Sequence, residues 1–292
     1  MKPHVLCFGE ILWDLFPHGH FLGGAPLNVA YHLSRLGCDG RLVSAVGRDQ
    51  LGHNALAAMA MAGLSAGRVG VHASLPTGTA VVQLDALGQA RFTLPQPVAW
   101  DEIPADTPAG ARVDAIVFGT LALRGPANRT ALRTLLDASP DAWCVCDVNL
   151  RPPFDDLDPL WPLLERADLL KVNADEALRL GGFKPEDKPA WPDVAARITR
   201  RFPRALLCIT LGADGAGLFV DGCWLPIKAE PVVVRDTVGA GDAFTAALVA
   251  GRLRASGAPA WERILRTASR LGGFVASRDG AQPDYGGFDP GL

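Results

Sequence analysis

One segment of the chain carries the clearest structural signal, the run VVVRDTVGAGDAFTAAL at residues 232–248. It begins with an apolar stretch, continues with a glycine-rich stretch and ends with an alanine-rich one. This order predicts a strand over Val232 to Val234, a tight turn, and a helix from about Gly241 to about Ala255. The backbone N–H groups of the first helical turn have no partner within the helix, and small residues leave them exposed. The segment therefore predicts a strand, turn and helix with an electropositive helix start.

The chemistry that suits this turn is anion binding. The N–H groups of Gly239, Ala240 and Gly241 and the helix dipole favour a negatively charged group, such as a phosphoryl group during transfer. Asp242 follows at the mouth of that site, where an ionised carboxylate can orient a hydroxyl group and accept its proton. A structural interpretation is equally open on spacing alone. In that interpretation Asp236 and Asp242 cap the helix or sit in its first turn, and the glycines allow close packing.

A second glycine-rich segment, GGAPLNVA at residues 23–30, precedes an amphipathic helix. The side-chain amide of Asn28 can donate to, or accept from, a hydroxyl group of a polyol bound beside Gly23 and Gly24. The alternative is an ordinary turn, with the proline in the first helical turn and Asn28 as a cap. Asp14 is an isolated carboxylate in an apolar stretch. It either binds paired hydroxyl groups or caps a turn.

Short apolar strand patterns alternate with helical patterns along most of the chain, which is typical of parallel βαβ units. We therefore expect a single α/β domain over residues 1–292, with a doubly wound, mostly parallel sheet flanked by helices. The expected strands are 5–9, 41–46, 115–118, 143–147, 169–172 and 205–210, with short strands and turns over 212–221 and 223–228. The expected helices are 25–36, 51–61, 128–138, 160–166, one from 174, 241–255 and 259–277.

Two regions break this alternation, roughly residues 11–22 and 68–97. Within the second, residues 79–84 and 90–94 flank a turn around Gly88, which predicts a hairpin without an intervening helix. In α/β enzymes such β insertions often cover the cleft at the carboxyl ends of the parallel strands, where ligands bind. These regions therefore predict a small β-sheet lid.

The composition describes a globular protein, because 49% of the 292 residues are hydrophobic and 20% are charged. The net charge is −3 and the basic residues are scattered, which argues against nucleic acid or anionic lipid as a partner. No stretch reaches the roughly 18 apolar residues of a membrane span, and Glu10 precedes any long apolar region, which argues against a signal peptide. Three of the predicted buried strands contain cysteines, four of the six in all, which favours a reducing, cytoplasmic setting.

The two glycine-rich segments, the β insertions and their order resemble the PfkB family of carbohydrate kinases, which has the ribokinase-like fold. The resemblance spans nearly the whole chain and is closest to the fructokinases. The residues that fit the amino-terminal signature of the family are Gly23, Gly24, Pro26, Asn28, Ala30, Gly37 and Gly47. Those that fit the carboxyl-terminal signature are Asp236, Thr237, Gly239, Ala240, Gly241, Asp242, Ala246 and Ala247.

This resemblance implies an ATP-dependent sugar kinase in which Asp242 is the catalytic base. The N–H groups of Gly239, Ala240, Gly241 and Asp242 are implied to form the anion hole. The segment DVNLR at residues 147–151 resembles a fructokinase motif. It implies either that Arg151 neutralises phosphate charge or that it forms a surface salt bridge. The implied sugar-binding residues are Asp14, Gly23, Gly24, Asn28 and Asp242.

The nucleotide site is implied by two further motifs. Asn173 and Glu176 resemble the N-x-x-E motif that holds Mg²⁺ and its water shell, although the same residues also form a helix capping box. The segment TLGADG at residues 210–215 resembles a nucleotide-binding turn, and its alternative is an ordinary turn between strands. Ser269 stands where many relatives carry an Asn near the adenine, which implies a weaker or water-mediated contact. The implied nucleotide-binding residues are Asn173, Glu176, Thr210, Leu211, Gly212, Gly215, Gly241 and Ser269.

The segment SRDGAQP at residues 277–283 resembles a loop that surrounds a monovalent cation in some relatives. K⁺ is the implied ion. The implied set for it is Asp236, Val238, Val275, Arg278, Gly280 and Asp284.

Fructose is the leading expectation for the substrate, because residues 24–28 resemble the sugar-binding turn of fructokinases. The alternatives are a nucleoside kinase or another sugar or sugar-acid kinase of the same fold, and a catalytically silent sensor of sugar or nucleotide. Gly239, Gly241 and Asp242 argue against the sensor. The absence of G-x-G-x-x-G after the first strand argues against a dinucleotide-dependent oxidoreductase. An exposed face of the lid also offers a place for a second copy of the chain, so a homodimer through the lid is one expectation.

Overall fold

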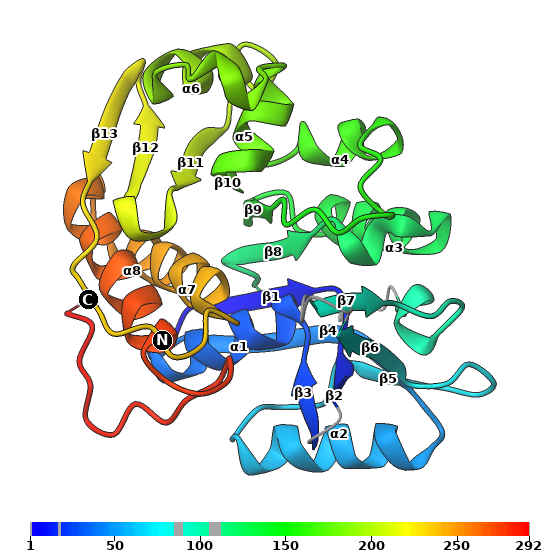
Figure 1. Cartoon of the computed structure of the whole chain (residues 1–292). Coiled ribbons are helices and arrows are strands. Elements are labelled where there is room, and N and C mark those ends of the chain that lie inside the picture. Colours follow the sequence, from blue (N-terminus) through cyan, green and yellow to red (C-terminus); the bar gives the residue numbers. More distant parts are fainter. Residues whose placement is uncertain (1, 17–18, 85–89, 105–111, 292) are drawn as a thin grey trace.

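The computed structural model describes residues 2–16, 19–84, 90–104 and 112–291. Within these ranges a nine-stranded sheet has the order β13-β12-β11-β10-β9-β8-β1-β4-β5 (Figure 1). The strands from β11 to β5 are parallel to their neighbours, and β12 and β13 are antiparallel at one edge. The bounds are β1 His4–Phe8, β4 Asp39–Gly47, β5 Val69–His72, β8 Ala115–Gly119, β9 Trp143–Asp147, β10 Leu169–Asn173, β11 Leu206–Thr210, β12 Ala216–Val220 and β13 Cys223–Ile227.

Helices cover both faces of this sheet, as the doubly wound prediction requires. Alternate strand residues supply the two cores: Val5 and Cys7 of β1 belong to one, and Leu6 and Phe8 to the other. The first core is closed by α1 Ala25–Arg35, α2 Gln50–Met61, α7 Ala240–Arg254 and α8 Trp261–Ala276. The second is closed by α3 Pro126–Asp137, α4 Trp161–Leu164, α5 Ala174–Gly181 and α6 Trp191–Thr199.

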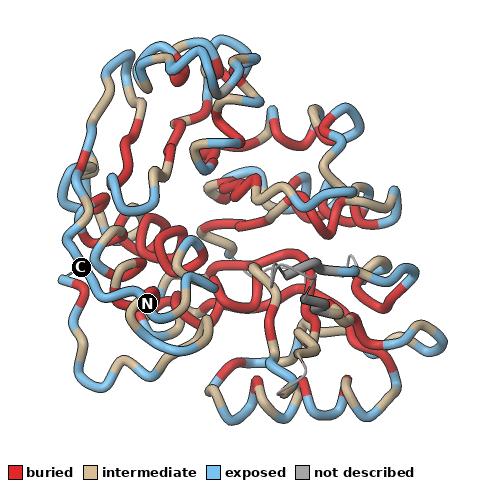
Figure 2. The backbone as a smooth tube through the Cα atoms, in the orientation of Figure 1, coloured by how far each residue is buried: buried red, intermediate tan, exposed pale blue. Residues whose placement is uncertain are grey.

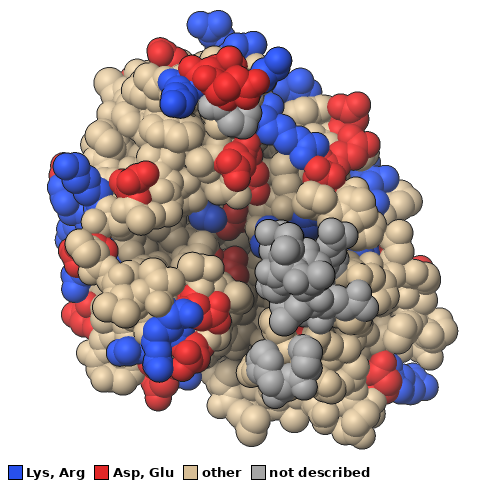
Figure 3. All heavy atoms as spheres, in the orientation of Figure 1, with Lys and Arg blue, Asp and Glu red and all other residues tan. Residues whose placement is uncertain are grey.

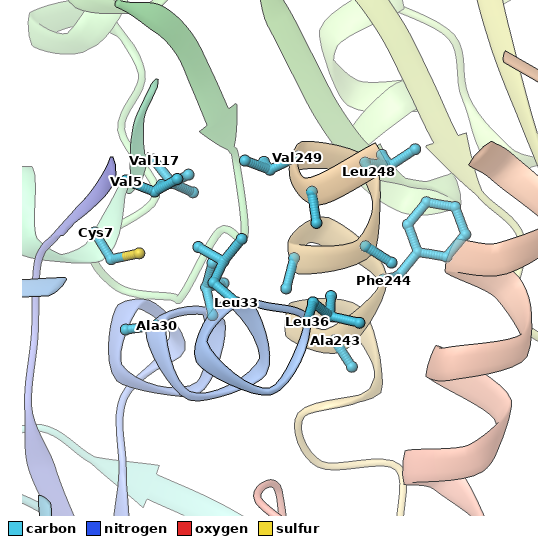
Figure 4. Packing of buried hydrophobic residues seen from close by; sticks show 14 of the residues in the cluster. Val5, Cys7, Ala30, Leu33, Leu36, Val117, Ala243, Phe244, Leu248 and Val249 are labelled. Atoms are coloured by element: carbon cyan, nitrogen blue, oxygen red, sulfur yellow. The ribbon is translucent and has the colours of Figure 1, made fainter. Parts of the chain in front are cut away.

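Helix α7 lies in the middle of the first core, beside α1 and α8 (Figure 1). All its residues from Asp242 to Gly251 are buried, and most of them are small. Leu33 of α1 and Leu248 and Val249 of α7 point into the same core as Val5 and Val117 of the sheet (Figure 4). Figure 2 shows the buried residues concentrated along the strands and these helices. Close packing on every side therefore fixes where α7 begins.

A second, four-stranded sheet has the order β3-β2-β6-β7, with β2 Leu12–Phe16, β3 Gly19–Gly23, β6 Gly78–Leu84 and β7 Ala90–Thr93. The predicted hairpin is confirmed, because β6 and β7 pair antiparallel. The turn expected around Gly88 lies outside the described residues. The expected lid boundary at residue 68 is wrong, because Val69–His72 pairs parallel with β4 and belongs to the large sheet. That segment follows α2 and completes a βαβ unit.

The strand expected over Val232 to Val234 is also wrong. This segment is irregular and exposed, and 85% of the surface of Val233 is accessible. β-Branched residues favour strands only where a neighbouring strand is available. Here the chain has left the sheet at Ile227 and crosses to the start of α7. Helix α6 is a further element that the alternation of patterns did not indicate. No helix in the described part of the chain has the length and apolar character to cross a membrane.

The packing of α1 against α7 gives a stability prediction. Leu33 is completely buried, so Leu33→Ala leaves a cavity and lowers the free energy of unfolding by about 2–5 kcal/mol. The control is Met61→Ala, at a side chain that is 85% exposed, where the loss is below about 0.5 kcal/mol. Urea unfolding of both variants measures the difference. Equal losses would show that the interface between the helices is loosely packed.

Candidate active site

The glycine-rich turn at the start of α7 has the backbone that its sequence predicts. Gly239 precedes the helix with φ 77°, a left-handed conformation that favours glycine. A Cβ atom there would lie 2.5 Å from the Cβ of Ala281, so the carboxyl-terminal segment also presses on this turn. The N–H of Ala240 donates weakly to the carbonyl of Thr237, at 3.3 Å. The helix therefore begins within one residue of its predicted position, and its first N–H groups lie at the expected place.

Asp242 joins the two glycine-rich segments of the sequence. Its carboxylate is buried in the first turn of α7 and accepts a hydrogen bond of 2.8 Å from the side-chain amide of Asn28, 214 residues away. Gln282 donates to the amide oxygen of Asn28 at 2.9 Å. Asn28 therefore does not cap α1, which begins at Ala25 and has Gly24 at its N-cap position. The sequence did not indicate Gln282, because nothing local relates it to Asn28.

Gly23 and Gly24 allow the chain to pass close to two acidic residues. A Cβ at Gly23 would lie 2.6 Å from the Oδ2 atom of Asp14, so the predicted sugar-binding residues Asp14 and Gly23 are neighbours. Gly24 has φ 120°, and a Cβ there would meet the carbonyl of Glu10. Glu10 also accepts the N–H of Ala25 at 3.2 Å. Burial raises the pKa of Asp14 to about 6 and also raises that of Glu10.

Several candidate residues lie at the carboxyl ends of neighbouring parallel strands, where ligands bind in α/β folds. Asp147 ends β9, Asn173 ends β10 and Thr210 ends β11. Asn173 and Thr210 are register partners, and Thr210 donates to the carbonyl of Val172 at 3.3 Å. The face of the molecule drawn in Figure 3 is hollowed, and acidic and basic side chains lie inside the hollow.

The N-x-x-E motif forms the capping box that its sequence predicts. The side chain of Asn173 accepts the N–H of Glu176, and that of Glu176 accepts the N–H of Asn173, both at 2.9 Å. The second carboxylate oxygen of Glu176 accepts the N–H of Leu150 at 2.7 Å. Glu176 is buried, which raises its pKa, whereas Asn173 and Arg151 are exposed. The motif therefore shapes the loop that carries Arg151.

The turn over residues 210–215 connects β11 to β12. Gly212 and Gly215 have φ values of 58° and 106°. A Cβ at Gly215 would collide with the carbonyl of Ile227, so this glycine is required for packing against the end of β13. Leu211 closes the turn by donating its N–H to the carbonyl of Gly215 at 2.8 Å. Gly212 has open space around it.

Ser269 lies on α8, one turn before Gly273. A Cβ at Gly273 would lie 3.3 Å from the side chain of Val232, so the exposed valine segment passes over this face of α8. Ser269, half-buried, therefore lies beside the segment that leads into the turn at Gly239.

The residues expected around a monovalent cation are only partly brought together. The side chain of Asp236 accepts the N–H groups of Val238 and Gly280, at 3.0 and 3.1 Å. The carbonyl of Val275 accepts the N–H of Arg278 at 2.9 Å. The side chain of Arg278 is exposed and lies over the ring of Phe274. Asp284 is exposed as well, and its carboxylate accepts the N–H of Gly286 at 3.2 Å.

One charged residue that the sequence patterns did not indicate lies directly under the turn. Lys171 of β10 is buried, and its ammonium group donates to Asp147 at 2.7 Å. A Cβ at Gly241 would lie 3.4 Å from this ammonium nitrogen. The signal was a lysine inside the apolar run of β10, where a charge is costly without a partner. Glu10 is the second missed residue, and it too is an ionisable group beside an apolar strand.

The surroundings of Asp242 raise its pKa to about 7. Burial is the main cause, and the charge of Asp147 adds to it. The hydrogen bond from Asn28 and the charge of Lys171 act in the opposite direction. A carboxylate that takes up and releases a proton near neutral pH suits general base catalysis.

The raised pKa of Asp242 predicts that Asp242→Asn stabilises the protein. The folded state holds the proton up to about pH 7, whereas the unfolded chain releases it near the usual 3.8, so the wild type loses stability as the pH rises between these values. The neutral amide avoids this loss. The gain in the free energy of unfolding therefore grows from pH 4 to pH 7, to on the order of a few kcal/mol, and is constant above.

Urea unfolding of ligand-free protein at pH 4, 5.5, 7 and 8 measures this gain. The matched control is Asp141→Asn, at an exposed position, where no comparable gain is expected. If Asp242→Asn is less stable than the wild type at pH 8, the raised pKa of Asp242 is contradicted.

Comparison with known proteins identifies the family. The model of the pfkB family of carbohydrate kinases matches residues 18–285. A fructokinase from Klebsiella pneumoniae is 32% identical over 276 residues, covering 89% of this chain and 87% of that protein. An aminoimidazole riboside kinase from Salmonella typhimurium is 30% identical over 302 residues, covering 95% and 90%.

The fold agrees with this match. The crystal structure of a fructokinase double mutant from Vibrio cholerae, in its fructose-, ADP- and potassium-bound form, superimposes with a TM-score of 0.84 at 22% identity and covers 96% of this chain and 94% of that one. The ribokinase-like fold is therefore confirmed. The chain belongs to the PfkB family of carbohydrate kinases, phosphotransferases that act on a sugar hydroxyl group.

Proposed function

We propose that this carbohydrate kinase is an ATP-dependent fructokinase. The observation that carries the proposal is the buried carboxylate of Asp242 in the first turn of α7, held at 2.8 Å by Asn28. It places a base with a pKa of about 7 beside the N–H groups of a helix start. Fructose as the substrate is supported by the similarity to the Klebsiella fructokinase and by the form of residues 24–28.

The sugar binds between the small sheet and α1. Asp14 accepts hydrogen bonds from sugar hydroxyl groups, and the backbone at Gly23 and Gly24 lets the sugar approach closely. The amide of Asn28 already bonds Gln282 and Asp242, so its orientation is fixed before the sugar arrives. Asn28 therefore aligns the reacting hydroxyl group with Asp242. The small sheet covers the bound sugar and excludes water.

Asp242 accepts the proton of that hydroxyl group as its oxygen attacks the γ-phosphorus of ATP. The bond from this phosphorus to the bridging oxygen breaks, and ADP leaves. The N–H groups of Gly239, Ala240 and Gly241 stabilise the negative charge on the transferred phosphoryl group. Arg151, in the loop after β9, adds a positive charge on the side of the nucleotide.

The nucleotide lies along the carboxyl ends of β10 and β11, against Asn173 and the turn from Thr210 to Gly215, with Ser269 near its base. Mg²⁺, bound with the nucleotide, would supply positive charge that neutralises the phosphates. Oxygen ligands suit this ion. Both oxygens of Glu176 accept backbone N–H groups, which fixes the orientation of its carboxylate. Asn173 and Glu176 would hold Mg²⁺ through its water shell.

K⁺ binding is proposed for the loop around Asp236. Asp236 already joins the turn before α7 to Gly280 of the carboxyl-terminal segment, so an ion held there would stiffen the anion hole. The Vibrio cholerae fructokinase structure contains a potassium ion. Backbone carbonyls such as those of Val238 and Val275 complete the proposed site. Asp284 joins it only if its turn with Gly286 opens.

A second candidate function is the phosphorylation of a nucleoside. The aminoimidazole riboside kinase from Salmonella is almost as similar to this chain as the Klebsiella fructokinase. A riboside and a hexose both present hydroxyl groups to Asp14 and Asn28, and a nucleoside kinase would use the same phosphoryl-transfer residues.

We also propose a homodimer through the small sheet and a cytoplasmic location. The edge strand β3 carries Phe21, which is half exposed, and its open edge can pair with a second copy. All six cysteines are free, which fits a reducing compartment.

The proposed function predicts the effect of Asp242→Asn on activity. In an assay of ADP release with fructose, the variant loses turnover by several powers of ten but retains its affinity for fructose and ATP, because only the proton acceptor is removed. The panel adds glucose, ribose, aminoimidazole riboside and adenosine, each with K⁺ and without it. Asp141→Asn is the matched control, with wild-type turnover.

Each result of this panel has a distinct meaning. Near-normal turnover of the Asp242→Asn variant would show that Asp242 is not the catalytic base. If the wild type prefers aminoimidazole riboside or adenosine over every hexose, the protein is a nucleoside kinase and not a fructokinase. No ADP release from the wild type with any substrate would favour a sensor.

A further inference from the structure

Lys171 is a buried charge that the proposed mechanism does not use. It lies in the run LLKVN of β10, and only 5% of its surface is accessible. Its ammonium nitrogen lies 2.7 Å from the Oδ2 atom of Asp147, so each charge has its partner within the interior. Lysine and its partner therefore remain an ion pair inside the protein.

The pair is built by three elements that meet under the start of α7. Lys171 of β10 donates to the Oδ2 atom of Asp147, at the end of β9, at 2.7 Å. The hydroxyl group of Thr245 of α7 lies 2.8 Å from the same oxygen and 3.0 Å from the carbonyl of Gly241. The ammonium nitrogen lies 3.4 Å from where a Cβ of Gly241 would be. The positive charge is thus in contact with the turn that forms the anion hole.

Stability alone does not account for such a pair. Removing two charges from water costs several kcal/mol for each ion, and apolar residues of similar volume are often as stable or more so. The cost is incurred here at the one helix start whose N–H groups face the proposed phosphoryl group. This position indicates a task in the reaction.

Other groups with a charge face the same place. Asp242 is approached by Asp147 from β9, by Lys171 from β10 and by Glu10 after β1. Glu176 of α5 interacts with both members of the pair. Cys208 of β11 faces Lys171, and burial raises the pKa of its thiol to about 12, so it stays neutral. Lys171 is the positive charge among these neighbours of Asp242.

We propose that Lys171 is a positioning residue for phosphoryl transfer: its ammonium group neutralises Asp147 beneath the anion hole and so allows Asp242 to ionise and act as the base. The proposal rests on the proposed function of Asp242. Without Lys171, the charge of Asp147 is no longer balanced, and Asp242 holds its proton to higher pH. The charge beneath Gly241 also favours the negative phosphoryl group above it.

The first test is the pH dependence of kcat/KM with the best substrate of the panel. In Lys171→Met the acidic limb of the profile moves to higher pH by about one unit or more, and kcat/KM at pH 6.5 falls about tenfold or more. In Asp147→Asn the limb moves to lower pH. In the double variant both charges are gone, and the limb returns to within about half a unit of the wild type. Lys184→Met, at an exposed lysine, is the matched control.

A merely structural role for the pair would lower the amount of active enzyme without moving the limb. Limbs that coincide in all variants, or that move in the same direction in Lys171→Met and Asp147→Asn, would overturn the proposal. If Lys171→Met does not fold, the double variant and Asp147→Asn still test the proposal. Neither of them leaves an unpaired buried carboxylate at position 147.

The second test needs no activity, so its failure is distinct from failure of the proposed function. In a double-mutant cycle at pH 8, Asp242→Asn raises the melting temperature more in the Lys171→Met background than in the wild type, because the missing ammonium makes the ionised Asp242 costlier. In the background that carries both Asp147→Asn and Lys171→Met, the rise equals that in the wild type. Equal rises in all three backgrounds would overturn the proposal.

Discussion

The hydrogen bond between Asn28 and Asp242 is the contact on which the site depends. It joins a helix near the amino terminus to a helix near the carboxyl terminus, and it forms only because α1 and α7 pack against each other in one core. Gly24 lets α1 begin where its fourth residue reaches Asp242, and Gly239 does the same for the start of α7. Each glycine is held in a conformation that other residues rarely adopt.

The buried charges around this contact lower the stability of the fold, but they suit the proposed phosphoryl transfer. Asp242 and Lys171 are both buried at the carboxyl edge of the sheet, together with Asp147 and Glu10. A core of apolar residues at these positions would avoid the cost of burying charge. The protein accepts that cost at the place where we propose that phosphoryl transfer occurs, and the low exposure makes each charge act strongly on the next.

Sequence patterns predicted most of the fold and part of the site. The alternation of strands and helices gave the doubly wound sheet, and the glycine-rich run gave the helix start to within one residue, because both depend on local chemistry. The capping box of Asn173 and Glu176 was predicted for the same reason. The approach of Asp14 to Gly23 follows from the pairing of neighbouring strands.

The remaining features depend on contacts between distant parts of the chain. The residue types of Val232 to Val234 favour a strand, but this segment does not pair with either described sheet. Gln282 reaches Asn28 across 254 positions of sequence. Lys171 was visible as a charge in an apolar run, but its partner Asp147 and its place under Gly241 follow only from the fold. Val69–His72 was assigned to the lid, because no local signal distinguishes an edge strand of one sheet from that of another.

The chemistry proposed for this site requires that the fold gives Asp242 a pKa near neutrality. A titration of the carboxyl carbons of aspartate by NMR, on wild type and on Asp242→Asn, measures this directly, since the signal that the variant lacks belongs to Asp242. We expect this signal to titrate near pH 7, because burial raises the pKa of Asp242. A signal for Asp242 that titrates below pH 5, among those of the exposed aspartates, would contradict it.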